Sequence, residues 1–273
     1  MKIAIVGCGY VGGAVARQWH QQAHEVTATT TTPKRVATLQ EVATRVIVAR
    51  GDDKVALQEA VQNQEIVLLS VGAKSSNLYE ETYLTTAKNL VAAIKEAASV
   101  KQLIYTSSCT VYGDKNNQWV DEETPLAPMT KNGEILAETE QVLLQAASEN
   151  LRVCILRLAG IYGPGRELTK IFQNVFGTVR PGSGDYFTNW IHLDDIVGAL
   201  EFVRSRQLQG IYNLADDECL TGKELLDRLS DRYGLPKVMW DASLQSSRPY
   251  KARISNAKIK KAGYKLIHPQ IQL

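Results

Sequence analysis

The 273-residue chain has few cysteines, no long apolar run and no block of like charge. Its four cysteines lie far apart without a C-x-x-C pair, which argues against a disulfide framework and a zinc site. Apolar runs such as residues 66–69 are too short to span a bilayer, and no signal-peptide pattern precedes the first predicted strand. The net charge of +2 is well mixed, which indicates neither nucleic-acid nor anionic-membrane binding. We therefore expect a cytoplasmic, reduced protein without a metal.

A glycine-rich turn near the N-terminus is the first candidate site. It follows the apolar run of residues 3–6 and opens a helix-like stretch at residues 14–21. In a dinucleotide fingerprint the first glycine permits a tight turn, the second admits a pyrophosphate and the third allows close helix packing. The phosphates then rest on free N–H groups at the helix start, whereas an ordinary glycine turn is the alternative. The candidate cofactor contacts in this turn are Gly7, Gly9, Tyr10, Val11 and Gly12.

Short β-rich runs alternate with longer stretches of helical periodicity through the first half of the chain. The predicted strands are residues 2–6, 25–29, 45–48, 66–71, 103–107 and 153–158. The predicted helices are residues 13–21, 34–41, 55–62, 83–98 and 134–148. This alternation predicts βαβ units and an α/β fold, namely a Rossmann-type doubly wound parallel sheet with a smaller α/β C-terminal lobe.

The domain organisation follows from a change of pattern after about residue 160. Gly-Pro clusters then interrupt the chain, and single helices and strands follow without regular alternation. We expect an NAD(P)-binding Rossmann domain at residues 1–162, with residues 188–215 returning to it. Residues 163–187 and 216–273 are expected to form a small lobe on the substrate side.

The end of the second predicted strand bears on the choice of nicotinamide cofactor. NAD-binding folds of this type place an acidic side chain there, whereas an arginine nearby accommodates the extra phosphate of NADP. Here three threonines precede Pro33, Lys34 and Arg35, while Glu41 comes only a helix later. We predict NADP, with NAD less favoured, because threonine hydroxyls and a guanidinium can hydrogen-bond to that phosphate. The candidate contacts are Thr30, Thr31, Lys34 and Arg35, with solvated cations in a helical turn as the alternative.

Several further segments, in order, carry a resemblance to a known family. They read TSSCTVYGD at residues 106–114, LRLAGIYGPG at 156–165, WIHLDDI at 190–196 and GIYNLA at 210–215. With the glycine turn, they resemble the extended short-chain dehydrogenase/reductase superfamily, in its NAD(P)-dependent sugar epimerase/dehydratase branch. The resemblance covers essentially the whole chain. It implies that Asp52 contacts adenine and that Val71 and Gly72 pass along the adenine ribose, with plain loop roles as the alternative. Members often form dimers, so a homodimer stays open.

The chain departs from this family at its catalytic residues. Members use a Ser or Thr to polarise the substrate oxygen, a Tyr to exchange the proton and a Lys to lower the Tyr pKa. Ser108 matches the family's serine. Asn132 and Leu136 stand where Tyr and Lys belong, although Gly133 and Glu140 keep the register. No tyrosine lies between residues 113 and 160. Because an amide exchanges no proton near neutral pH and leucine carries no charge, the usual proton-transfer pair is absent. The chain as a whole resembles an atypical, YeeZ-like branch of the family.

For the other residues near these motifs, a structural role is the favoured interpretation. Cys109 fills a turn, Tyr112 packs or positions, and His192 joins a strand to a helix. One of Asp194 and Asp195 is expected to cap that helix. For Arg248 and Arg253, anion binding in the small lobe and surface salt bridging stay open.

The function expected from these features is that of an NADP-binding atypical short-chain dehydrogenase/reductase. We expect an oxidoreductase or epimerase-like enzyme acting on a small carbonyl/hydroxyl or sugar-nucleotide substrate. Ser108 would polarise the reacting oxygen together with Asn132, and neither could act as a base. The alternative is a non-catalytic NADP-binding protein that senses redox state or regulates a partner, which the missing Tyr and Lys favour.

Overall fold

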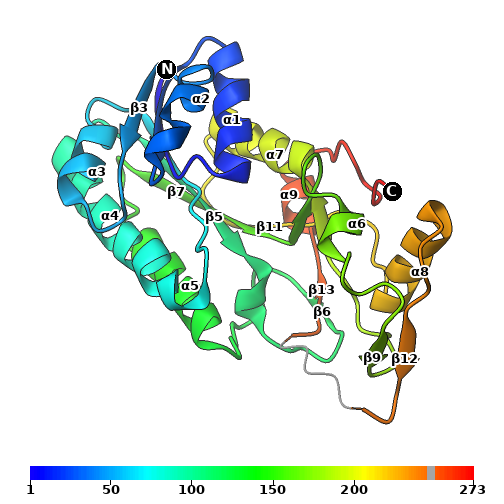
Figure 1. The fold of residues 1–273 in the computed structure, drawn as a ribbon. Coiled ribbons are helices and arrows are strands. Elements are labelled where there is room, and N and C mark those ends of the chain that lie inside the picture. Colours follow the sequence, from blue (N-terminus) through cyan, green and yellow to red (C-terminus); the bar gives the residue numbers. More distant parts are fainter. Residues whose placement is uncertain (245–249) are drawn as a thin grey trace. The chain divides into compact units, whose positions relative to one another are not determined.

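The computed structural model describes residues 1–244 and 250–273 and is dominated by one seven-stranded sheet (Figure 1). Its strands are β1 (Lys2–Val6), β2 (Glu25–Thr30), β3 (Arg45–Val48), β4 (Ile66–Leu69), β5 (Gln102–Ser108), β7 (Arg152–Leu158) and β11 (Gly210–Leu214). They follow the order β11-β7-β5-β4-β1-β2-β3, and the strands from β5 to β3 pair in parallel. The order reverses between β1 and β4, as in a doubly wound Rossmann-type sheet. The predicted fold class is confirmed.

The helices that accompany this sheet follow the predicted alternation. They are α1 (Tyr10–Gln21), α2 (Val36–Gln40), α3 (Lys54–Val61), α4 (Thr86–Ala97), α5 (Lys131–Leu144) and α7 (Leu193–Ser205). Short turns of other helix types are η1 (Pro33–Arg35), η2 (Ser76–Leu78), the π-helical η3 (Glu80–Thr85) and η4 (Cys109–Tyr112).

The core of the sheet explains why its strands read as apolar runs. Helices α3, α4 and α5 pack in a row (Figure 1) over a core that includes Ala4 and Val6. Ile3 and Ile5 point to the other face because side chains alternate along a strand, and they are equally buried. The chain crosses from β1 to β2 in one direction along the sheet and from β3 to β4 in the other. Because such crossovers are right-handed, α1 lies on the face opposite to α3. There Trp19 Nε1 of α1 donates to Glu201 Oε2 of α7 at 2.8 Å.

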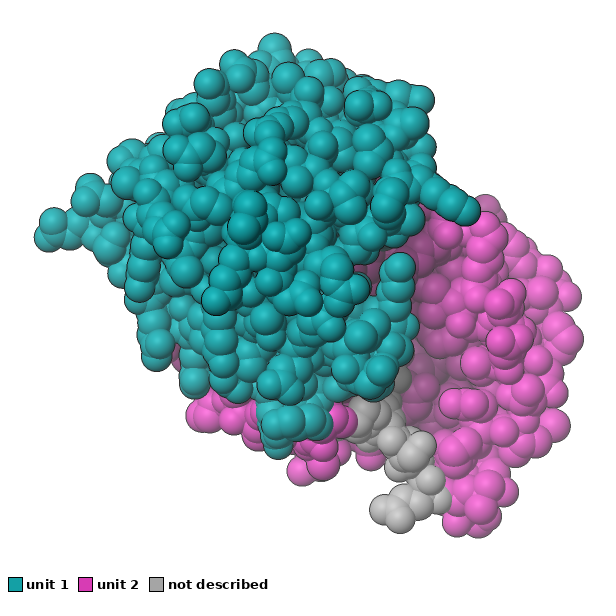
Figure 2. Space-filling model, turned by 60° about the vertical axis from the view of Figure 1, so that its left-hand side comes forward, with its two compact units in different colours: residues 1–108, 131–157, 197–212 teal, residues 109–130, 158–196, 213–273 magenta. Residues whose placement is uncertain are grey.

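The chain forms two compact units (Figure 2). The first consists of Met1–Ser108, Lys131–Arg157 and Val197–Tyr212, and the second of Cys109–Thr130, Leu158–Ile196 and Asn213–Leu273. The second unit contains three pairs of short parallel strands: β8 (Gly160–Tyr162) with β10 (Trp190–His192), β9 (Val179–Pro181) with β12 (Met239–Asp241), and β6 (Trp119–Val120) with β13 (Arg253–Ile254). Its helices are α6 (Leu168–Ile171), α8 (Gly222–Tyr233) and α9 (Ala257–Lys261). The expected domain boundaries stay predictions.

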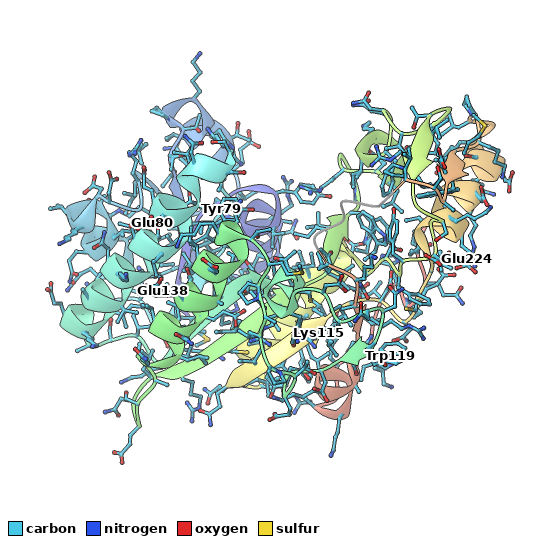
Figure 3. The ribbon with its side chains drawn as sticks, turned by 90° about the horizontal axis from the view of Figure 1, so that it is seen from below. Tyr79, Glu80, Lys115, Trp119, Glu138 and Glu224 are labelled. Carbon is cyan, nitrogen blue, oxygen red and sulfur yellow. The ribbon has the colours of Figure 1, made fainter. Side chains whose placement is uncertain are left out.

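Helix α8 organises the core of the second unit. Thr221 Oγ1 accepts from the Glu224 N–H at 3.2 Å, and Glu224 Oε2 accepts from the Thr221 N–H at 2.8 Å. This capping box fixes the start of the helix, and Figure 3 labels Glu224. The apolar face of α8 buries Leu225 and Leu229 in a core that also contains Tyr162. In residues 1–244 and 250–273, no helix combines the length and apolarity needed to cross a membrane.

Candidate functional site

The glycine turn after β1 contains glycines of two different kinds. Gly7 has a φ of +97°, and a Cβ there would lie 2.5 Å from Ser70 O. A Cβ at Gly12 would lie 2.2 Å from Gly7 O. The chain's own packing therefore requires these two glycines. At Gly9, by contrast, no heavy atom of the described residues outside Gly9 and the adjoining backbone lies within 4 Å of the Cβ position. The space over Gly9, directly before the start of α1, is open.

A cavity of about 340 Å³ lies at this turn, within the first unit. Its lining comes from residues 6–9 after β1, 29–32 at the end of β2, 49–51 after β3 and 70–72 after β4, with Arg35, Leu57, Lys74, Leu78, Glu81, Thr82 and Thr86. These segments follow the carboxyl ends of their strands, where the strand order reverses. Ligands of open α/β sheets bind in the crevice at this position.

The structure brings together most of the predicted cofactor contacts. Those on the cavity lining are Gly7, Gly9, Thr30, Thr31, Arg35, Val71 and Gly72. The lining, which comes entirely from described residues, does not include Tyr10, Val11, Gly12, Lys34 or Asp52. Val11 is buried and Lys34 is exposed. These two cases show that a motif assigns neighbouring residues to one loop but does not say which of them face its ligand.

The lining at the end of β2 carries hydroxyls and a cation. Thr29 Oγ1 accepts from the Gly7 N–H at 2.9 Å, which ties this strand to the glycine turn. Thr30 Oγ1 accepts from the Thr32 N–H at 3.2 Å. Arg35 is half-buried, and its guanidinium forms no ion pair within the described residues. Burial raises the pKa of the Cys8 thiol to about 12, so this lining residue is neither charged nor a nucleophile at neutral pH.

The lining also contains residues that sequence reasoning missed. The Arg50 guanidinium pairs with Glu81, and its Nε lies 3.2 Å from Asp52 Oδ1. Asn89 Nδ2 of α4 donates to Gly51 O at 2.8 Å, which holds this loop in place. Arg50 and Glu81 line the cavity, whereas the predicted Asp52 is their exposed neighbour. The place of Arg50 two residues after a predicted strand is the signal that could have found it.

The predicted catalytic residues lie at the end of β5 and the start of α5. Ser108 is the last residue of β5, and Asn132 lies in the first turn of α5; both are half-buried. The residues that line the cavity, all described, include neither of them. Leu136, one turn beyond Asn132, is 5% exposed. The position predicted to match the family's lysine therefore carries a buried apolar side chain.

A buried ion pair fixes the elements around Ser108. Arg157 Nη2 of β7 lies 2.7 Å from Glu140 Oε2 of α5, and both side chains are almost fully buried. Ser107 Oγ of β5 donates to Glu140 Oε1 at 2.6 Å. One carboxylate thus joins a helix to two strands, and it does so through the residue next to Ser108.

In the second unit, the other weighed residues have structural contacts. The Tyr112 hydroxyl is buried and donates to Asn213 Oδ1 at 2.7 Å. Asp195, fully buried, accepts from the backbone N–H groups of Ile267 and His268 at 2.6 and 2.9 Å, so it holds the C-terminal segment. The Arg253 guanidinium lies 3.8 Å from the centroid of a phenylalanine ring, while Arg248 lies outside the described residues.

Comparison with known proteins shows the family of the chain. A model of the NAD dependent epimerase/dehydratase family matches residues 3–215. The chain belongs to the NAD dependent epimerase/dehydratase family. The predicted resemblance is therefore confirmed.

Among relatives of this epimerase/dehydratase family member, Protein YeeZ from Escherichia coli strain K12 is 32% identical over 256 residues, covering 90% of this chain and 89% of YeeZ. A functionally unknown conserved protein from Silicibacter pomeroyi superposes with a TM-score of 0.77 at 25% identity, over 98% of this chain and 94% of its own. The UDP-glucuronic acid 4-epimerase of Bacillus cereus, in complex with UDP-glucuronic acid and NAD, gives a TM-score of 0.77 at 17% identity. That superposition covers 100% of this chain and 95% of the epimerase chain, and it shows the shared fold alone.

Proposed function

We propose that the protein binds NADP(H) in the cavity of the first unit and acts as an oxidoreductase or epimerase-like enzyme. Its substrate would be a small carbonyl/hydroxyl compound or a sugar nucleotide. The observation that carries the proposal is the end of β2, where Thr30, Thr31 and Arg35 line the cavity and residues 29–35 contain no acid. Family membership supports the nicotinamide coenzyme, and this local chemistry supports the phosphorylated form.

The cavity has the features that a diphosphate needs. The open space over Gly9 lets a ligand approach the backbone, and α1 presents its first N–H groups directly after it. The Cβ position of Gly72 is equally open with respect to the described residues. A volume of about 340 Å³ is at the lower end of the range for cofactor pockets and suits the adenosine end of a dinucleotide.

The charges on the lining favour an additional phosphate. Arg50 is already paired with Asp52 and Glu81, whereas Arg35 forms no ion pair within the described residues. A guanidinium on a half-buried lining is suited to bidentate hydrogen bonds with phosphate oxygens. An acid at the end of β2 would repel that phosphate, and the sequence has threonines there.

The chemistry assigned to this chain differs from that of the Tyr-x-x-x-Lys members. A bound nicotinamide supplies or accepts a hydride. We assign to Ser108 and Asn132 the hydrogen bonds that polarise the substrate oxygen, since both are half-buried polar groups. Neither acts as a general acid or base near neutral pH, so water supplies the proton in this proposal. The complex of the related-fold epimerase with UDP-glucuronic acid supports sugar nucleotides as one substrate class.

The second candidate function is that of a non-catalytic NADP-binding protein that senses redox state or regulates a partner. The burial of Leu136 favours it, because the position of the family's lysine provides neither charge nor hydrogen bonds.

Two measurements test and separate these functions. Fluorescence titration should give a lower Kd for NADPH than for NADH; tighter NADH binding would overturn the cofactor assignment. A screen of carbonyl and sugar-nucleotide substrates should then reveal NADPH oxidation that falls in Ser108→Ala but not in Ser205→Ala, an exposed serine at the end of α7. NADPH binding without turnover of any substrate would favour the regulatory function.

A further inference from the structure

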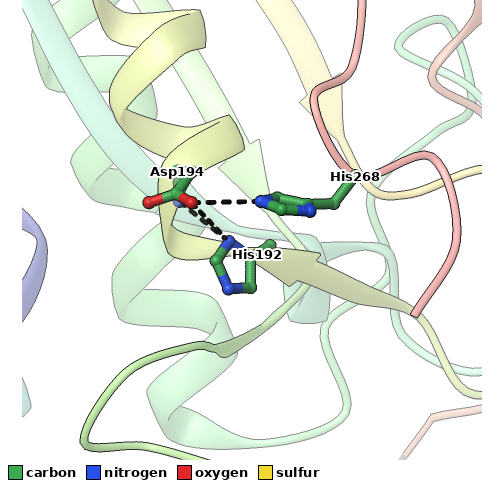
Figure 4. A group of neighbouring side chains, drawn as sticks. All are labelled: His192, Asp194 and His268. Atoms are coloured by element: carbon green, nitrogen blue, oxygen red, sulfur yellow. Dashed lines mark hydrogen bonds and ion pairs between the residues drawn. The ribbon is translucent and has the colours of Figure 1, made fainter. Parts of the chain in front are cut away.

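Three metal-ligating side chains meet in the second unit, outside the proposed coenzyme site. Figure 4 shows His192 and His268 next to each other, both facing the Asp194 carboxylate. Asp194 Oδ2 lies 3.0 Å from His268 Nε2 and 3.4 Å from His192 Nδ1. The two imidazole rings have their centroids 4.1 Å apart. These two nitrogens and one oxygen all lie within 4.8 Å of one another.

Two of the three separations between the ligand atoms are close to those in a metal's coordination shell. Metal–nitrogen and metal–oxygen bonds of about 2.0–2.1 Å in tetrahedral geometry put neighbouring ligand atoms about 3.3 Å apart. The two measured nitrogen–oxygen separations, 3.0 and 3.4 Å, lie on either side of that value. His192 Nδ1 accepts from the Asp194 N–H at 3.2 Å, so this nitrogen is unprotonated, and a metal bound to it would replace that hydrogen bond.

Each ligand is attached to a fixed part of the second unit. His192 ends β10 and is 8% exposed, and Asp194 lies in the first turn of α7. His268 belongs to the C-terminal segment, where its own N–H donates to the buried Asp195 carboxylate at 2.9 Å. The Tyr264 hydroxyl donates to Asp195 O at 2.8 Å and anchors the same segment. The site is thus held in place by contacts outside its ligands.

The geometry points to a binding site for a first-row divalent transition metal, with His192, Asp194 and His268 as its ligands. Two imidazoles and one carboxylate suit Zn²⁺, Co²⁺ or Fe²⁺ better than Mg²⁺ or Ca²⁺, which prefer oxygen ligands. Three protein ligands leave a position for water or for an oxygen of a bound molecule. His192 also lines a cavity of about 380 Å³ in the same unit, together with Tyr162 and Glu167. A metal here would tie the C-terminal segment to β10 and α7.

Calorimetric titration of the metal-free chain with Zn²⁺, without coenzyme, tests this site. We expect a single equivalent to bind and the Tm to rise by about 5 °C or more at a hundredfold excess over Kd. His268→Ala and Asp194→Ala should each weaken Zn²⁺ binding by at least about tenfold. His20→Ala, an exposed histidine of α1, and Cys219→Ser should bind as the wild type does.

A second measurement keeps the test independent of folding defects in the variants. Co²⁺ added to the wild type should give the visible absorption of a site with nitrogen and oxygen ligands, and Zn²⁺ should displace it. Absence of Zn²⁺ binding, or equal binding by wild type and His268→Ala, would overturn the site. Because these experiments contain no coenzyme, neither result bears on the NADP(H) proposal, which the coenzyme titration tests separately.

Discussion

The substitution Arg35→Gln should separate the two nicotinamide coenzymes. Arg35 lies in the turn after β2, on the cavity lining, and it forms no ion pair within the described residues. NADPH carries a phosphate on the adenosine ribose that NADH lacks. If this phosphate meets the guanidinium, glutamine removes a charge-assisted hydrogen bond from NADPH binding alone.

The expected size of the effect follows from the half-buried position of Arg35. Two unit charges about 4 Å apart attract by about 4 kcal/mol at an effective dielectric of about 20. Desolvation of both groups offsets part of this, and hydrogen bonds to charged groups contribute about 1.5–3 kcal/mol net. The Kd for NADPH should therefore rise about 10- to 150-fold, while the Kd for NADH changes little.

Fluorescence titration of both coenzymes at one ionic strength measures this effect. The matched control is Lys34→Gln, because Lys34 is the exposed neighbouring cation and does not belong to the cavity lining formed by the described residues. The converse variant, Thr31→Asp, should weaken NADPH binding and favour NADH, since an acid at the end of β2 repels the phosphate and can hold ribose hydroxyls. Equal losses for NADPH and NADH in Arg35→Gln would refute the assignment of Arg35 to the phosphate.

Three further predictions concern packing, burial and charge. Gly9→Ala should leave the Tm unchanged but abolish coenzyme binding. Gly12→Ala, whose Cβ would lie 2.2 Å from the Gly7 carbonyl oxygen, should lower the free energy of unfolding by about 1–3 kcal/mol in denaturant titration. Glu140→Gln should lower the free energy of unfolding by about 3–5 kcal/mol, because it removes the carboxylate that pairs with the buried Arg157. A loss under about 1 kcal/mol in the same assay, which is the usual contribution of an exposed ion pair, would contradict this. Burial raises the pKa of Asp216 from 3.8 to about 8, so the folded state keeps a proton that the unfolded state releases. The unfolding free energy should accordingly fall as pH rises from about 4 to about 8, and Asp216→Asn should flatten that fall.

The sheet could be predicted from the sequence because its signal is local. Parallel strands are buried on both faces, so β1 and β4 read as continuous apolar runs, and the helices between them keep their own period. Element ends were less predictable: β4 ends at Leu69 rather than residue 71, and α1 begins at Tyr10 rather than residue 13. The homodimer and the cytoplasmic location stay predictions.

The candidate site was only partly predictable because its walls come from distant segments. The glycine turn has a fixed spacing, but the pairing of Arg50 with Glu81 joins a loop to a helical turn 31 residues away. Neither residue belongs to a motif. The prediction of no metal was based on the spacing of the cysteines, and this spacing gives no information about His192 and His268. The Asp194–His268 contact spans 74 residues and arises only through the fold.

Helix α5 shows how the chain departs from its family without losing the frame of the site. Asn132, Leu136 and Glu140 are spaced four residues apart, so they lie along one face of the helix. Glu140 forms the buried pair with Arg157 and accepts a hydrogen bond from Ser107, so it fixes the helix to the two strands beside Ser108. Asn132 and Leu136 provide no Tyr–Lys pair, whereas the end of β5 that carries Ser108 is held by the Ser107–Glu140 hydrogen bond. A fixed frame without that pair fits both functions proposed above, a reaction with another proton source or coenzyme binding alone.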